Sequence, residues 1–123
     1  EHYQAFIGGL TEAKVDYDAR ARDETIERSR HAALGASHEC LAQLSAISGG
    51  PDRPMLVQMD SGAGPEAPDW RSSSVGRELQ FLCSHTIHHY ALIRALLEAA
   101  GVELDREFGV APSTLSYQRA VLR

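Results

Sequence analysis

The sequence predicts an all-α protein, and three observations carry that prediction. Residues 23–48 and 73–100 each repeat apolar side chains at intervals of three, four and seven positions, which is the spacing of an amphipathic helix. Glycine or proline follows each of these segments, as is usual after a helix. Residues 55–59 read as a short extended segment in a long loop, and one isolated strand cannot form a sheet.

The elements of the first half follow in order. Residues 1–7 are predicted to form a short helix that two glycines end. Residues 11–22 are a polar connection. Asp23 has a short side chain that suits the N-cap of a helix, so a helix is expected from there to about residue 48.

The second half is predicted to be a loop followed by the longest helix. Residues 51–71 are rich in Pro, Gly, Asp and Ser, which is typical of a loop. Ser73 or Ser74 is expected to cap the long helix, and Gly101 is expected to end it. A turn and a short helix capped by Ser113 complete the chain.

The composition is that of an ordinary globular protein. The 123 residues suffice for a single domain, 1–123, and 43% of them are hydrophobic. The net charge of −5 provides no basic face for a nucleic acid, and no apolar run approaches the ~20 residues that span a membrane. Two cysteines are no disulfide framework and no secretory leader is visible, so a cytoplasmic location is expected. Because the chain opens without Met inside a predicted helix, we expect it to be incomplete at its N-terminus.

Three of the six histidines lie between Ser84 and Tyr90. In a helix, His85 and His89 stand one turn apart, ~6 Å along the axis, and both fall on the apolar face of residues 73–100. Two imidazoles that converge from one helix are half of a transition-metal site. The alternative is a pair of core histidines bonded to neighbouring backbone or carboxylate groups.

A third ligand has to come from another helix. His2, which lies beside Tyr3 and Phe6 in the first predicted helix, is the first candidate, and a frayed terminal histidine is the alternative. His38 is the second candidate and His31 lies seven residues earlier. Exposed side chains without a metal are the alternative for both.

Further polar residues accompany this pair. Glu78 is interpreted as a ligand, as an acceptor that orients an imidazole N–H, or as half of a salt bridge to an arginine on another helix. His88 lies at the edge of the apolar face and is either a proton relay or a partly exposed surface histidine. The alternating charges of residues 17–23 indicate a fixed network or, alternatively, a solvated loop.

A second face of the long helix is unusually poor in charge. It consists of Ser84, Ile87, Ala91 and Ala95. Such a face is expected to pack against a missing helix or another subunit, so a homodimer is predicted.

Residues 76–93, which contain His85-Thr86-Ile87-His88-His89-Tyr90 and then an apolar run, resemble the metal-binding helix of the DinB-like (YfiT-type) four-helix bundles. Residues 15–23 and 108–115 also resemble a bacterial branch of that family. The resemblance implies an up-down bundle, often homodimeric, whose first helix is missing here. It also implies a histidine triad that holds Zn or Ni. Two triad positions carry over to His85 and His89, and His2 stands in for the third.

The resemblance further implies a function. Family members with assigned activity include transferases and isomerases that depend on low-molecular-weight thiols. We therefore expect a divalent-metal-dependent enzyme, in which the metal holds a thiol as thiolate or activates water for hydrolysis of a small-molecule substrate. The alternative is a non-catalytic homodimeric helical bundle with structural or metal-sequestering histidines.

Overall fold

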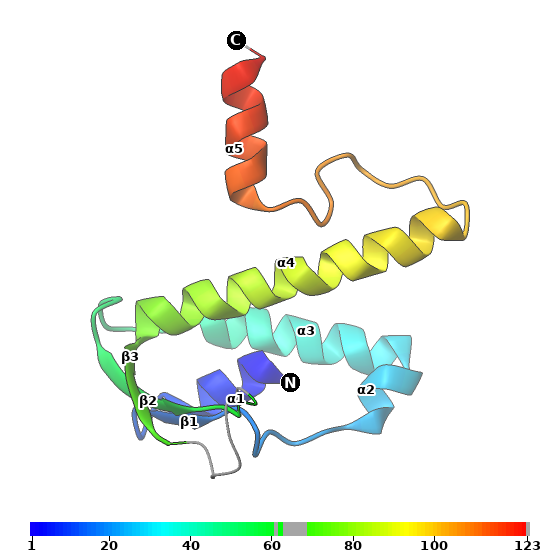
Figure 1. Cartoon of the computed structure of the whole chain (residues 1–123). Coiled ribbons are helices and arrows are strands. Elements are labelled where there is room, and N and C mark those ends of the chain that lie inside the picture. Colours follow the sequence, from blue (N-terminus) through cyan, green and yellow to red (C-terminus); the bar gives the residue numbers. More distant parts are fainter. Residues whose placement is uncertain (61, 63–68, 123) are drawn as a thin grey trace. The chain divides into compact units, whose positions relative to one another are not determined.

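The structure is a computed structural model that describes residues 1–60, 62 and 69–122. Over these residues the elements are α1 (His2–Gly9), β1 (Lys14–Asp16), α2 (Glu24–Arg28), α3 (Arg30–Ser45), β2 (Pro54–Gln58), β3 (Arg71–Ser74), α4 (Val75–Ala99) and α5 (Pro112–Val121) (Figure 1). The chain divides into two compact units, Glu1–Leu79 and Gln80–Arg123, which are described in turn. The assignment of one domain over 1–123 stays a prediction.

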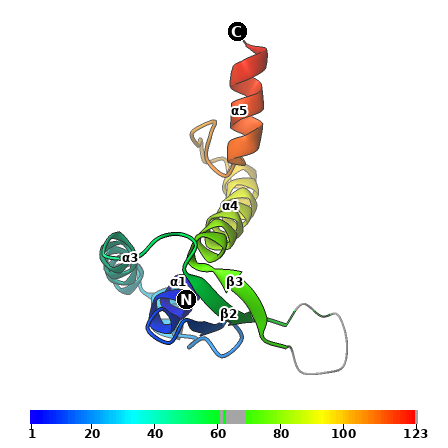
Figure 2. The ribbon, with the colours of Figure 1, turned by 90° about the vertical axis from the view of Figure 1, so that its left-hand side faces the viewer.

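The all-α prediction is wrong, because the first unit contains a three-stranded mixed sheet in the order β1-β2-β3 (Figure 2). β1 runs parallel to β2, with Val15 opposite Val57, and β3 runs antiparallel to β2, with Ser73 opposite Met55. Each strand has only three to five residues, and β3 is one arginine and three serines. Strands this short carry no readable alternation, and the sheet forms because distant segments complete one another's backbone hydrogen bonds.

Helix α1 packs against β1 and against α3 in the first unit. Among the described residues of this unit, the buried hydrophobic side chains come from α1, the sheet, the residue after β1 and the start of α4, and they are Phe6, Val15, Tyr17, Met55 and Val75. Gly9 lets the end of α1 approach β1 closely. A Cβ at Gly9 would lie 2.3 Å from the Lys14 carbonyl oxygen and 2.6 Å from Val15 Cγ2.

The helix predicted over residues 23–48 is two helices. Asp23 caps α2, as predicted, by accepting a hydrogen bond from the Thr25 backbone N–H at 2.8 Å. Ser29 then breaks the helix with an extended backbone (φ −125°, ψ 110°), and its hydroxyl accepts from the Ala32 N–H at the start of α3. A residue that caps one helix in this way necessarily ends the preceding one.

The second unit consists of the rest of α4, a connection over residues 100–111, and α5. The connection folds back onto α4, where the Phe108 ring stacks on Tyr90 with centroids 5.0 Å apart and Arg94 Nη1 donates to the Phe108 carbonyl at 3.0 Å. Gly109, at φ +71°, permits this approach, since a Cβ there would lie 2.8 Å from the Tyr90 carbonyl oxygen.

Helix α5 begins differently from the prediction. Its N-cap is Ala111, which makes no side-chain hydrogen bond, and Pro112 occupies the first turn, so the predicted Ser113 cap is wrong. Proline suits this position because its fixed φ is helical and its missing N–H would be unpaired anyway. In the described part of the chain, no helix has both the length and the apolar character needed to cross a membrane.

Candidate functional site

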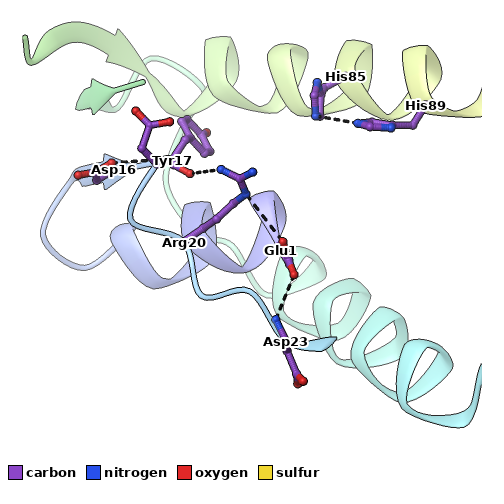
Figure 3. A network of polar contacts seen from close by, with 8 residues as sticks. Glu1, Asp16, Tyr17, Arg20, Asp23, His85 and His89 are labelled. Atoms are coloured by element: carbon purple, nitrogen blue, oxygen red, sulfur yellow. Dashed lines mark hydrogen bonds and ion pairs between the residues drawn. The ribbon is translucent and has the colours of Figure 1, made fainter. Parts of the chain in front are cut away.

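His85 and His89 lie one turn apart on α4, and their rings meet (Figure 3). The two Nε2 atoms are 3.1 Å apart, and the ring planes are nearly perpendicular, at 82°. Phe81 stacks on His85 with ring centroids 5.7 Å apart. His85 is half-buried and His89 is exposed, so the pair is less buried than the apolar stripe predicts. The structure brings the two residues together, and their role as metal ligands stays a prediction.

Of the remaining histidines only His88 lies beside this pair, with its ring centroid 5.6 Å from that of His89. His31 and His38 are exposed on α3 and His88 is exposed on α4. His2 is half-buried on α1, and its ring centroid lies 6.0 Å from that of Tyr17. Within residues 1–60, 62 and 69–122, no group of three or more His, Cys, Asp or Glu side chains is arranged to hold a metal ion.

Glu78 belongs to a buried hydrogen-bond network in the first unit and is only 5% exposed. The Tyr17 hydroxyl donates to Glu78 Oε2 at 2.8 Å, and the Ser73 hydroxyl donates to Oε1. Burial, this hydrogen bond and the charge of Glu78, in that order, raise the pKa of Tyr17 well above its usual range. Among the described residues no arginine or lysine pairs with Glu78, so the hydroxyl pair takes the place of the expected salt bridge.

Hydrogen bonds and an ion pair hold the segment from Tyr17 to Asp23, most of which is exposed (Figure 3). Arg20 Nη1 donates to the Tyr17 carbonyl at 2.7 Å, and Arg20 Nε lies 3.8 Å from Glu1 Oε2. Glu1 Oε1 accepts from the Asp23 N–H at 3.2 Å. The hydrogen bonds from Thr25 hold the pKa of the exposed Asp23 carboxyl below its ordinary value. These contacts tie the segment to Glu1, the N-cap residue of α1, a partner that the charge alternation did not predict.

A groove of about 300 Å³ lies where α1 and α3 end in the first unit. Its lining residues are Ile7, Leu10, Thr11, Gln43, Ala46, Ile47, Ser48 and Arg53. The Nε atom of Arg53 is buried and, among the described residues, has no hydrogen-bond partner. The sequence assigned no role to these residues, because the groove joins two helix ends and a strand entry that are far apart in the chain.

The chain is similar to FK506-binding protein 5 of Rhizopus delemar. The two are 34% identical over 106 residues, which are 84% of this chain and 27% of the relative. The chain thus spans about a quarter of the length of that relative. No family model matches the chain, and no solved structure matches it.

These findings overturn the resemblance to the DinB-like four-helix bundles. The matching relative is an FK506-binding protein, and a mixed sheet is present where a helical bundle was expected. The His-x-x-x-His motif and apolar run that carried the resemblance fit any amphipathic helix with two histidines on one face.

The function that the resemblance implied is contradicted as well. The metal-dependent enzyme with thiol-transfer or hydrolytic chemistry is wrong, because the relative is of another kind and the described residues hold no three-ligand group. The alternative of a non-catalytic helical bundle is wrong because the first unit contains a sheet.

Proposed function

We propose that this chain is a ligand-binding domain related to FK506-binding protein 5, and that it binds prolyl peptides and FK506. The observation that supports the proposal is the 34% identity, which extends over 84% of the chain. Because the chain corresponds to 27% of the relative, the relative's name does not say which of its segments binds FK506. The proposal therefore also needs a site within the chain.

We assign that site to the groove at the ends of α1 and α3. Ile7, Leu10 and Ile47 supply apolar walls, and Thr11 and Arg53 supply hydrogen-bond donors for a carbonyl oxygen. The lining of this groove is more polar than that of most small-molecule sites, and about 300 Å³ is at the lower end of their ~300–1,000 Å³ range. The groove has room for a proline residue and its amide, with the rest of a larger ligand outside.

The charges around the groove favour a neutral ligand. The C-terminal end of a helix carries a partial negative charge of about half an elementary unit, and two such ends line this groove. The Arg53 guanidinium offsets them. An amide, which offers both a donor and an acceptor, suits these surroundings better than a carboxylate or an ammonium group.

Peptidyl-prolyl isomerisation is the reaction that such a site supports. Rotation about an X–Pro bond breaks no covalent bond, and its barrier of ~18–20 kcal/mol reflects lost amide resonance. A site that contacts the twisted amide more favourably than the planar one lowers this barrier. In this groove, the apolar walls hold the proline ring and Arg53 donates to the carbonyl oxygen of the rotating amide.

The protein is therefore expected to accelerate cis–trans exchange in a short X-Pro peptide, which takes tens to hundreds of seconds unaided. Ile47→Asp should lower kcat/KM about 10- to 100-fold, because it places a charge in the apolar wall. Leu34→Asp, at a 49% exposed position on α3, is the matched control and should leave kcat/KM unchanged. NMR exchange spectroscopy measures both rates. Wild-type exchange at the unaided rate would remove the isomerase assignment.

We also propose, separately from any catalysis, that His85 and His89 bind Zn or Ni. For an ion at about 2.05 Å from both Nε2 atoms, the Nε2–metal–Nε2 angle would be about 98°, between the octahedral and tetrahedral values. The 3.1 Å separation therefore fits two ligands of one ion.

The purified protein is expected to carry about one Zn or Ni per chain, and His85→Ala should lose it. His38→Ala, an exposed histidine on α3, should keep the full metal content. Elemental analysis after dialysis measures the ratio. Metal content that is the same in both variants would contradict the assignment.

A cytoplasmic location is part of the proposal. Cys40 and Cys83 are both free thiols, which is usual in a reducing compartment. The charge of −5 favours a small molecule or peptide over a nucleic acid as partner.

A further inference from the structure

Helix α5 is too short and too poorly packed to be stable by itself. It has ten residues, none of them buried, and its N-cap makes no side-chain hydrogen bond. Isolated helices below ~12–15 residues are marginal in water. Arg119 pairs with both carboxylate oxygens of Glu107 at 2.9 and 3.0 Å, but this pair is exposed, and exposed ion pairs contribute little. The helix needs a packing partner.

Large apolar side chains are exposed on α5. Tyr117 and Val121, one turn apart on the same face, are 69% and 65% exposed, and Leu122 directly after the helix is 87% exposed. In a monomer such residues would be placed where the chain could cover them.

The C-terminal half of α4 also exposes large apolar side chains. Leu92 and Leu96, again one turn apart, are 52% and 72% exposed, and Ile93 beside them is 42% exposed. Within the second unit α5 does not cover them, because it projects away from α4 in both views (Figures 1 and 2). One chain thus presents two apolar helix faces that do not pack on each other.

We propose that a second copy of this chain covers these faces, and that α5 of each copy packs on α4 of the other. Each copy then both contributes and receives an apolar helix, which is the self-complementary arrangement of a two-fold dimer with exchanged elements. This inference does not depend on the proposed function.

The exposed apolar area agrees with a dimer interface. At roughly 100 Å² for a whole aliphatic side chain and ~150–250 Å² for an aromatic one, the six exposed fractions amount to ~400–500 Å² per copy. A standard interface buries ~800 Å² per partner, of which somewhat more than half is apolar. The exposed apolar area of the second unit thus equals the apolar area that one partner buries in a standard interface, without any contribution from the first unit.

The test is the mass of the protein in solution. Sedimentation or light scattering should give twice the 13.4 kDa of one chain. Leu96→Asp and Val121→Asp should each give monomers, because each spoils both exchanged contacts. Leu41→Asp, at a 60% exposed position on α3, is the matched control and should stay dimeric.

Mixing the two monomeric variants tests the exchange itself. In a mixed pair, the unaltered α5 of the Leu96→Asp chain meets the unaltered α4 of the Val121→Asp chain, so the mixture should recover a dimer fraction that neither variant forms alone. A mass of 13.4 kDa for the unaltered protein at every concentration of a 100-fold dilution series would overturn the proposal. So would a mixture that stays monomeric while both variants retain their helical circular dichroism. If either variant fails to fold, the mass of the unaltered protein decides.

Discussion

Replacing Gly9 by alanine is expected to lower the free energy of unfolding by about 1–3 kcal/mol, which is the usual cost of overpacking. The added Cβ would lie 2.3 Å from the Lys14 carbonyl oxygen, which is backbone of β1 and cannot rotate away. The end of α1 would have to move off the sheet. Because Val15 on β1 is only 1% exposed, that movement also disturbs a buried contact.

The neighbouring Gly8 provides a control of opposite sign. Nothing lies within 4 Å of a Cβ at Gly8, and the residue is helical, so Gly8→Ala should raise the free energy of unfolding by about 0.5–1 kcal/mol. Urea denaturation of both variants measures the difference. Two variants that shift in the same direction would contradict the packing of α1 on β1.

Removing the hydroxyl of Tyr17 is expected to cost about 1–3 kcal/mol, because the buried Glu78 carboxylate loses one of its two hydroxyl donors. Glu78→Leu should cost a similar amount, since it leaves the Tyr17 hydroxyl without its acceptor. The double variant should cost less than the sum of the two, with a coupling of about 0.5–3 kcal/mol. Tyr117→Phe, at a 69% exposed tyrosine, is the control and should change stability by less than about 0.5 kcal/mol.

The same network predicts a loss of stability in alkali. The pKa of Tyr17 is raised in the folded protein, so the folded state keeps a phenol proton that the unfolded chain loses near its ordinary pKa of 10.0. The corresponding stability is fully present below pH 10 and declines as the pH rises further. Tyr17→Phe should remove this decline. Urea denaturation between pH 9 and 11 measures the decline in both proteins. If the stability of the wild type and of the variant declines equally, groups other than Tyr17 cause the decline.

Local signals in the sequence predicted the helices better than the sheet. Asp23 at an N-cap and the run of residues 73–100 are recognisable because capping and helical periodicity act within a few positions. Ser29 was missed as a break, although a serine before a helical run is a capping signal in its own right. β1 and β3 could not be predicted, because their stability comes from β2, about 40 residues from β1, rather than from their own composition.

In the candidate sites too, contacts within one helix were predictable from the sequence and contacts between distant segments were not. The contact of His85 with His89 follows from their spacing on one helix, so the sequence predicts it. The hydroxyl partners of Glu78 are not among the roles predicted for it, because Tyr17 reaches it from a distant segment. The groove beside Arg53 has no sequence signal, since its apolar walls come from Ile7, Leu10 and Ile47, at the ends of two separate helices.

Titration of FK506 into this chain by calorimetry tests the central proposal most directly. We expect saturable binding of one FK506 per chain and competition by an X-Pro peptide. Ile47→Asp should weaken the affinity at least about tenfold, and Leu34→Asp should leave it unchanged. Absence of any saturable binding would contradict the assignment of FK506 binding to this segment. Equal affinity in the wild type and Ile47→Asp would show that the groove at the ends of α1 and α3 is not the site.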